Sequence, residues 1–255
     1  MAKKKTDEPK VYKEHPSVDQ RITDTLRENY MPYAMSVIVS RAIPEIDGFK
    51  PSHRKLLYTM YKMGLLNGNR TKSANIVGQT MKLNPHGDAA IYETMVRLTR
   101  GNEALLMPFV DSKGNFGKVY SRDMAYAAPR YTEAKLDAFC AELFRDIDTD
   151  AVDFVDNYDG EMKEPTLLPT TYPNILVSAN TGIAVGMASN FCGFNLAEVC
   201  RTTIELIKNP EHDIISTLPA PDFTTGGDLI YDEAEMRAIY RTGRGSFKVR
   251  AKWAY

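Results

Sequence analysis

The stretch that decides the fold is residues 73–101, with the sequence SANIVGQTMKLNPHGDAAIYETMVRLTRG. It predicts two short helices, one at about Ser73 to Lys82 and one from Gly87 to Arg100. The apolar residues that share one face of the second helix are Ile91, Met95 and Leu98. Short helices joined by tight turns are typical of a helix-turn-helix, so we expect one here.

The neighbouring residues extend this unit in both directions. Upstream, a further helix is predicted from Pro51 to Met63, ended by Gly64. Downstream, 106–110 and 116–120 flank a polar turn and predict a hairpin. Helices followed by such a hairpin, or wing, predict a winged-helix domain. After the hairpin, a helix is predicted at about 133–144.

The N-terminal part is expected to differ from this unit. Residues 1–16 are polar and lysine-rich without periodicity, which predicts a flexible arm. A helix is predicted from Ser17 to about Arg41, with Gln20 completing a capping box. Pro32 is expected to kink or split that helix, because proline has no amide hydrogen.

The sequence changes character near Asp150, where prolines and glycines become more frequent. We therefore expect two domains, over 17–150 and 151–255, the second of mixed α/β type, and an α+β fold overall. A helix capped by Asn195 is predicted to run to Lys208, and another near 233–241. Residues 247–255 alternate and predict a strand. Because no closing element follows that strand, we expect the sequence to be a fragment of a longer chain.

Composition sets limits on function. The chain has 255 residues, 43% hydrophobic and 25% charged, as in ordinary soluble globular proteins. The sequence has no secretory signal and no apolar run near the ~20 residues of a membrane span, so a cytoplasmic location is expected. The net charge of −1 disfavours a simple basic nucleic-acid binder. Basic residues are nevertheless frequent over 50–130, which allows a local basic face.

The three cysteines are expected to be reduced and structural. Their number is odd, no Cys-x-x-Cys occurs, and Cys192 and Cys200 have no histidine nearby. The acidic string 146–150 does not fit a calcium loop and is interpreted as a solvated charge run. We therefore expect no metal site on this chain.

Several motifs occur together in a fixed order. They are YAMSVIVSRAIP (33–44), PHGDAAIY (85–92), GNFG (114–117), RYTE (130–133), VDFVDNYDG (152–160), GIAVGMA (182–188) and YRTGRG (240–245). In order and spacing they resemble the A subunits of bacterial type IIA topoisomerases, the DNA gyrase and topoisomerase IV family. The resemblance covers nearly everything from Ser17 to Tyr255. It implies a winged-helix cleavage domain followed by the first part of a tower domain.

The resemblance implies that Tyr131 is a nucleophile that cuts DNA and forms a transient 5′-phosphotyrosine link. By itself Tyr131 is one of 14 tyrosines. Its phenol, with a pKa of about 10, needs help to lose a proton. Arg130 is the adjacent cation, but neighbours in a regular strand point to opposite sides. Arg130 therefore assists only if the backbone is irregular, which Pro129 favours although the family usually has a small or flexible residue there.

The resemblance also implies contacts with DNA and with drugs. The implied DNA-contact residues are Arg41, Lys50, His53, Arg54, Lys55, Lys72, Ser73, His86 and Ile183. Ile183 matches an isoleucine that wedges between base pairs, although an isoleucine beside glycines is more often a core residue. Ala89 occupies the position of a serine that anchors fluoroquinolones in many members, and Glu93 keeps the acidic partner. We therefore expect weaker quinolone sensitivity.

Further implications concern partners. The family acts with a B subunit that binds magnesium (Mg2+) and ATP, as a homodimer of A subunits within an A2B2 heterotetramer on double-stranded DNA. The resemblance thus implies a cytoplasmic, nucleoid-associated enzyme for ATP-dependent strand passage, and a chain that does not cut DNA alone. Two alternatives remain open. One is a non-catalytic winged-helix DNA-binding protein, and the other is a tyrosine recombinase, which links DNA through 3′ ends.

Overall fold

The computed structural model describes residues 19–253. The centre of its first half is a group of three helices, α3 (Pro51–Lys62), α4 (Ser73–Thr80) and α5 (Asp88–Leu98). The predicted arm over 1–16, the Ser17 cap and the last two residues lie outside this range. The three helices confirm the sequence predictions to within about two residues at each end. Their inner faces carry fully buried side chains, among them Leu56, Ile76 and Met95.

A three-stranded antiparallel sheet lies beside these helices, in the order β1 (Thr71–Lys72), β3 (Glu133–Leu136), β2 (Val110–Lys113). The predicted hairpin is wrong, because β2 pairs with β3 and not with residues 116–120. The predicted helix over 133–144 is wrong in its first half. Side chains of β3 alternate between partly exposed and buried, as a two-residue period requires. Only then follow η3 (Ala138–Cys140) and α6 (Ala141–Phe144).

The N-terminal helical run is built from four consecutive segments. These are α1 (Ile22–Thr25), the π-helical η1 (Leu26–Tyr30), α2 (Met31–Val37) and the π-helical η2 (Ile38–Ala42). Pro32 is the second residue of α2 and follows directly on the π-helical η1, so the helical hydrogen-bond pattern changes next to the proline although the run continues. The run therefore passes through Pro32 and ends one residue beyond the predicted Arg41.

The second half of the fold consists of small hairpins and helices. The hairpins are β4 (Phe154–Asp156) with β5 (Lys163–Pro165), β6 (Asn180–Ile183) with β7 (Ala188–Phe191), and β8 (Asp228–Ile230) with β9 (Lys248–Arg250). The helices are α7 (Asn174–Val177), α8 (Leu196–Lys208), η4 (Ile214–Ser216) and α9 (Glu233–Thr242). The structure confirms the two predicted long helices. It also confirms a strand within 247–255, although over three residues only.

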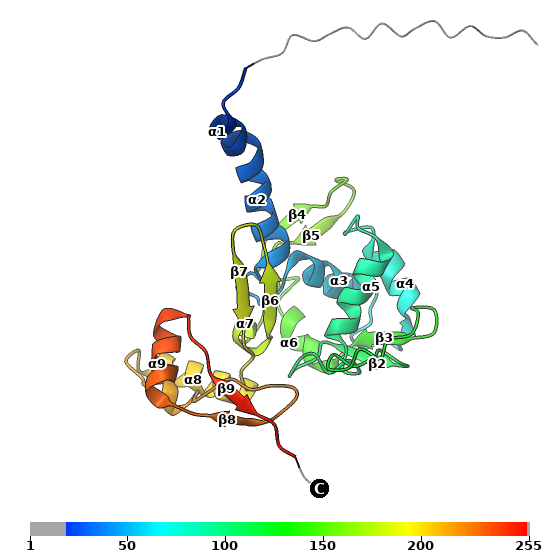
Figure 1. Ribbon diagram of the computed structural model, residues 1–255. Coiled ribbons are helices and arrows are strands. Elements are labelled where there is room, and N and C mark those ends of the chain that lie inside the picture. Colours follow the sequence, from blue (N-terminus) through cyan, green and yellow to red (C-terminus); the bar gives the residue numbers. More distant parts are fainter. Residues whose placement is uncertain (1–18, 254–255) are drawn as a thin grey trace, which may run out of the picture.

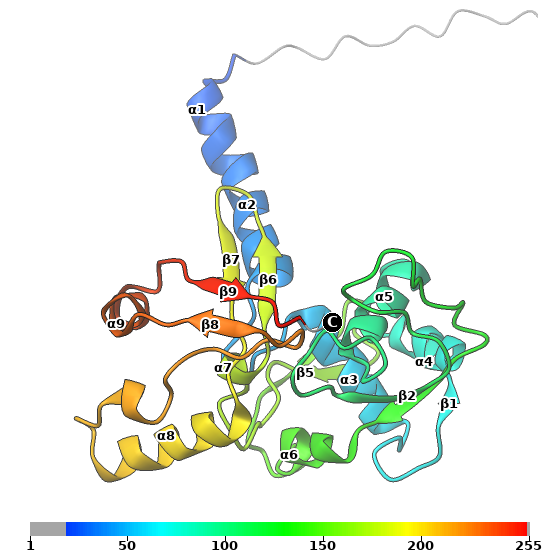
Figure 2. The same ribbon diagram turned by 60° about the horizontal axis from the view of Figure 1, so that its bottom comes forward.

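Figures 1 and 2 show how these parts are arranged. Helices α3 to α5 and the sheet form one lobe, and α8, α9, β8 and β9 form another. Between them the β6–β7 hairpin stands alongside the N-terminal helical run, and both project from the same side of the molecule. The mixture of helices and small antiparallel sheets confirms the α+β class.

One hydrophobic cluster holds the halves together. It includes residues of α3 to α6 and continues past residue 150 to Leu168, Tyr172 and Val177. The three cysteines are free, and burial raises the pKa of the Cys140 thiol. No helix within residues 19–253 is both long and apolar enough to cross a membrane.

Candidate functional site

Tyr131 lies in a tight turn and not in a strand. Its amide donates a hydrogen bond of 2.9 Å to the Ala128 carbonyl oxygen, which closes a four-residue β-turn. Pro129 takes the second position of that turn, where its fixed φ is favoured. The Tyr131 side chain is 65% exposed. Pro129 therefore builds the turn that presents Tyr131 to solvent.

Arg130 folds back onto Tyr131. Its Cζ atom lies 4.6 Å from the centroid of the Tyr131 ring, a cation–π distance. Consecutive side chains of a regular strand could not meet in this way. The prediction of irregular backbone at this point is thus confirmed, and a cation lies next to the phenol.

Two backbone hydrogen bonds fasten the Tyr131 turn to helix α4. The Ala74 amide donates to the Pro129 carbonyl oxygen at 3.2 Å, and the Ser73 amide donates to the Thr132 carbonyl oxygen at 3.0 Å. The first amides of a helix have no partner inside the helix, and here the N-cap residue supplies no side-chain bond. The residues on both sides of Tyr131 therefore cap α4.

Tyr92 of α5 holds the same segment from inside the protein. Its hydroxyl donates to the Ala127 carbonyl oxygen at 2.8 Å and lies 2.9 Å from the Thr132 hydroxyl. Sequence reasoning did not single out Tyr92 or Thr132. The available signal was that a tyrosine on the apolar face of a helix needs a partner for its hydroxyl.

A hollow of about 720 Å³ opens where the end of the N-terminal helical run meets the first turns of α3 and α5. Its lining includes Arg41, Lys55 and His86, which come from three separate segments. The Lys55 ammonium group donates to the Leu83 carbonyl oxygen at 2.9 Å and lies 3.2 Å from Glu164 Oε1. The structure thus brings three of the predicted DNA-contact residues to one concave surface.

Lys50 and His53 lie at the start of α3 in a cluster of cations. The Lys50 ammonium group donates to the Thr181 carbonyl oxygen of β6 at 2.9 Å. Burial, and then the charges of Lys50 and Arg97, lower the pKa of His53 to about 4. Burial and Arg97 also lower the pKa of Lys50. An anion placed beside this cluster would relieve the repulsion between its cations.

Two residues of the predicted DNA-contact set are buried, which corrects the prediction for them. The Arg54 guanidinium pairs with the Asp47 carboxylate, at 2.8 Å from Nε to Oδ2, and is shielded from solvent. The Ser73 side chain is fully buried, and its oxygen accepts a hydrogen bond from Thr132. Both side chains hold the fold together. Lys72, by contrast, is largely exposed and pairs with Glu133 at 2.8 Å.

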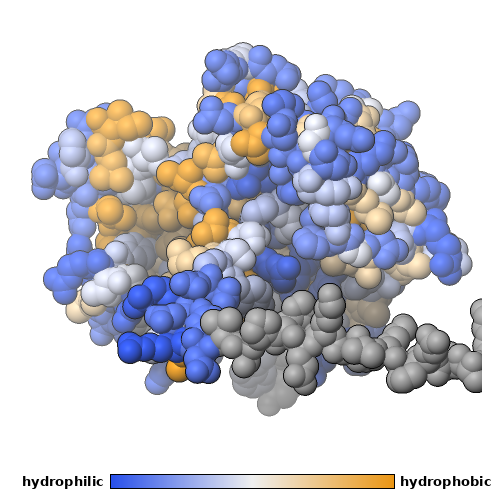
Figure 3. Space-filling view, turned by 90° about the horizontal axis from the view of Figure 1, so that it is seen from above, coloured by the Kyte–Doolittle hydropathy of each residue, from blue (hydrophilic) through white to orange (hydrophobic). Residues whose placement is uncertain are grey.

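Ile183 lies at the end of the β6–β7 hairpin and is 83% exposed. The interpretation as a core residue is therefore wrong. Figure 3 shows that apolar surface gathers in the middle and left of the upper face, whereas the right-hand part is mainly blue and white. Met187 and Phe191, on the returning side of the hairpin, are also partly exposed.

Gly182 explains how the hairpin is held in place. Gly182 is buried, and a Cβ atom added there would overlap the carbonyl oxygen of Ala42 in η2. The backbones of β6 and the N-terminal helical run are thus in direct contact, which only glycine permits.

Ala89 and Glu93 lie on the exposed side of α5. They are four residues apart, so their side chains share one face of the helix. Tyr92 lies on the buried side of the same helix. One short helix therefore carries both the predicted drug-contact region and a group that holds the Tyr131 turn.

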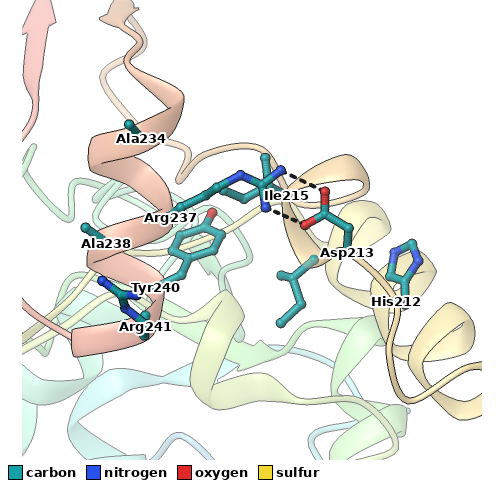
Figure 4. Close-up of a pocket in the computed structure, with 9 residues that line it drawn as sticks. His212, Asp213, Ile215, Ala234, Arg237, Ala238, Tyr240 and Arg241 are labelled. Atoms are coloured by element: carbon teal, nitrogen blue, oxygen red, sulfur yellow. Dashed lines mark hydrogen bonds and ion pairs between the residues drawn. The ribbon is translucent and has the colours of Figure 1, made fainter.

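Another pocket, of about 600 Å³, lies between α9 and residues 212–215, and Figure 4 shows its lining. Arg237 reaches across it to Asp213 through two hydrogen bonds, of 2.6 and 2.8 Å. None of the predicted site residues lines this pocket. Within residues 19–253, no three His, Cys, Asp or Glu side chains are placed to hold a metal.

Comparisons with known proteins agree with the motifs. A family model for the A subunit of DNA gyrase/topoisomerase IV matches residues 41–255. The A subunit of DNA gyrase from Staphylococcus epidermidis is 45% identical over 240 residues, which is 92% of this chain and 26% of that protein. The A subunit of DNA topoisomerase 4 from Rickettsia conorii is 45% identical over 237 residues, 90% of this chain and 32% of that protein. This chain thus spans about a quarter to a third of the length of these relatives.

Proposed function

The chain belongs to the family of DNA gyrase and topoisomerase IV A subunits, and from this premise we propose that it carries out DNA breakage and reunion in a type II topoisomerase. The observation that carries the proposal is the Tyr131 turn. An exposed tyrosine, stacked with an arginine, is fastened to a helix and thereby held in one place. A tyrosine that serves only packing needs neither exposure nor such fastening.

In the proposed reaction the Tyr131 phenol gives up its proton to a base or to water, and its oxygen attacks a DNA phosphorus atom. A bond forms between this oxygen and the phosphorus at the 5′ end. The bond to the 3′ oxygen breaks, and that oxygen leaves with a proton as a hydroxyl. Resealing reverses each step, and one phosphoester replaces another throughout. Arg130 offsets charge that develops on the phosphate, since guanidinium matches phosphate geometry.

We assign the DNA-contact surface to those members of the predicted set that keep at least part of their surface in solvent. They are Arg41, Lys50, His53, Lys55, Lys72, His86 and Ile183. The first six supply positive or hydrogen-bonding groups for phosphates, whose contacts position DNA without reading its sequence. Ile183, at the tip of its hairpin, would enter a base step and bend the duplex.

In this proposal residues 17–150 form a winged-helix cleavage domain, with the 19 residues between β2 and β3 as its wing. Residues 151–255 form the first part of a tower domain. The small antiparallel sheet of β1, β3 and β2 beside helices α3 to α5 supports the first assignment, because a winged helix joins a three-helix unit to such a sheet.

The described residues include no group of three His, Cys, Asp or Glu side chains that fits a metal ion. We propose that magnesium and ATP are bound by a partner B subunit, and that two A and two B subunits form the working enzyme on double-stranded DNA. Localisation in the cytoplasm with the nucleoid belongs to the same proposal.

A cleavage-trapping assay tests the function. The chain is mixed with a B subunit from a relative, magnesium and end-labelled duplex DNA, and the reaction is stopped with detergent. We expect protein linked to DNA 5′ ends, and no such adduct with Tyr131→Phe. Tyr120→Phe is the matched control, because Tyr120 lies between the same two strands and is 60% exposed.

Retention of the adduct in Tyr131→Phe would exclude this nucleophile. DNA binding without any adduct in the unchanged chain would favour the non-catalytic winged-helix alternative. An adduct at 3′ ends would favour recombinase chemistry.

A further inference from the structure

Three buried hydroxyl groups form a row behind the Tyr131 turn. The Thr132 hydroxyl donates to Ser73 Oγ at 2.8 Å, and its oxygen lies 2.9 Å from the Tyr92 oxygen. Because the Thr132 proton is engaged with Ser73, the single Tyr92 proton is shared between the Thr132 oxygen and the Ala127 carbonyl oxygen. Tyr92 is 4% exposed, and Thr132 and Ser73 are fully buried. Buried polar groups are costly unless paired. The row therefore favours one arrangement of α4, α5 and the segment between them.

The row contacts the chain both before and after Tyr131. The Tyr92 hydroxyl lies 2.8 Å from the carbonyl oxygen of Ala127, which is four residues before Tyr131. It also contacts the hydroxyl of Thr132, which is one residue after Tyr131. A single phenol oxygen thus bridges the two ends of a six-residue segment. The Tyr131 ring itself is mostly in solvent. Its position therefore depends on the backbone of this segment more than on packing around the ring.

The geometry points to Tyr92 as a positioning residue for Tyr131, and we propose that its hydroxyl, acting through Ala127 and Thr132, places the Tyr131 oxygen for attack on phosphorus. This inference rests on the proposed function. Attack requires the reacting atoms at about 3–3.5 Å and in line, and a displacement of about 1 Å can cost on the order of a hundredfold in rate.

Tyr92 suits positioning and not proton transfer. Burial raises its pKa, and the nearby Tyr126 adds to this, although the hydrogen bond with Thr132 acts in the opposite direction. The phenol therefore keeps its proton at neutral pH and remains a donor. Because its proton is engaged inside the protein, Tyr92 does not compete with Tyr131 for DNA.

The test compares Tyr92→Phe, Thr132→Val and Thr132→Ser with the unchanged chain, each together with a B subunit. Two quantities are measured, the single-turnover rate of adduct formation and the Kd for DNA. For Tyr92→Phe and Thr132→Val we expect a rate about 10- to 100-fold lower with Kd changed less than about twofold. Thr132→Ser restores the hydroxyl, so its rate should stay within about threefold of the unchanged chain.

Tyr126→Phe is the matched control. The Tyr126 ring packs edge-on against Tyr92 at 5.5 Å between centroids, but its hydroxyl takes no part in the row. It should leave both rate and Kd unchanged. In Tyr92→Phe the rate should fall by the same factor at every pH between about 7 and 10, because a positioning residue does not change which group titrates.

The outcomes separate the two proposals. An unchanged rate in Tyr92→Phe, beside a normal adduct in the unchanged chain, would overturn the positioning role alone. An equal loss of rate and DNA affinity would overturn it as well, because it would indicate general damage to the fold. Absence of the adduct in the unchanged chain would overturn the proposed function and this inference together.

Discussion

At the scale of single residues, the pKa of His53 is strongly lowered by the surroundings of its side chain. Burial and neighbouring cations lower its pKa to about 4, against about 6.5 in an unfolded chain. Between these values the unfolded state binds the additional proton. Stability is therefore complete above about pH 6.5 and is lost as the pH falls toward 4.

His53→Gln should reduce this pH dependence. In the unchanged chain the free energy of unfolding should fall by up to about 3 kcal/mol more between pH 6.5 and 4 than in the variant. Urea unfolding at several pH values measures the difference. Parallel curves for the two proteins would show that His53 is not kept neutral by the fold.

A second prediction at the scale of single residues concerns Ala89, where serine would add one hydroxyl oxygen. Ala89→Ser should increase fluoroquinolone-stabilised cleavage by about fivefold, the effect of about one hydrogen bond. Ala90→Ser is the matched control, since Ala90 is the next exposed residue of α5. The assay is a drug titration of adduct yield. Equal sensitivity of Ala89→Ser and the unchanged chain would contradict the expectation.

At the scale of elements, the contact between β6 and η2 should tolerate no side chain. Gly182→Ala places a Cβ atom on the Ala42 carbonyl oxygen, which must shift by moving backbone. Overpacking of this kind costs on the order of 1–3 kcal/mol or more. Thermal unfolding should show a lower Tm. A Tm equal to that of the unchanged chain would mean that the hairpin can leave the helix freely.

Gly78→Ala provides the comparison for that measurement. Gly78 lies in α4 with open space around its Cα atom. Alanine there should leave the stability unchanged or raise it by up to about 1 kcal/mol, because alanine is the better helix former. Both substitutions add one methyl group, so a Tm that falls only in Gly182→Ala would indicate the close contact with Ala42 and not the methyl group itself.

The elements also show what the sequence could and could not predict. Helices α8 and α9 were predictable because local signals mark their ends, such as the Asn195 cap and Gly243 with φ 67°. Strand β3 was not, because Glu, Ala, Lys and Leu are good helix formers. Its strand character depends on β1 and β2, which are distant in the sequence.

The candidate site also contains residues that the sequence could predict and residues that it could not. Tyr131, Arg41 and His86 follow from motifs, and the structure places Tyr131 at the surface and the other two in the lining of the hollow beside α3 and α5. The inward turn of Arg54 could not be predicted, because the run from Lys50 to Lys55 does not indicate which cation faces a buried carboxylate. That choice depends on where Asp47 lies in the assembled fold.

At the scale of the whole molecule, Asp47 joins segments that are far apart in the sequence. Its carboxylate accepts hydrogen bonds from Arg54 and from the Leu168 amide, and its carbonyl oxygen accepts one from Asn174. Asp47→Ala would leave the buried Arg54 charge without a partner. Breaking such a pair costs about 3–5 kcal/mol, and urea unfolding should show a loss of that size.

Asp213→Ala is the matched control for this loss. Asp213 also pairs with an arginine, Arg237, through two hydrogen bonds, but both side chains are in contact with solvent. Exposed pairs contribute little to stability, so little change is expected. Similar losses in the two variants would mean that burial is not what gives the Asp47 pair its importance.

The capping of α4 by the Tyr131 turn has a geometric consequence for where a DNA strand would be cut. Because the Pro129 and Thr132 carbonyls accept hydrogen bonds from the first amides of α4, the turn is held at a fixed place relative to the start of the helix. If α4 rests on a duplex, the severed bond lies at a constant offset from it, whatever bases are present. The spacing of breaks along the duplex would then be a property of the protein's dimensions and not of the DNA sequence.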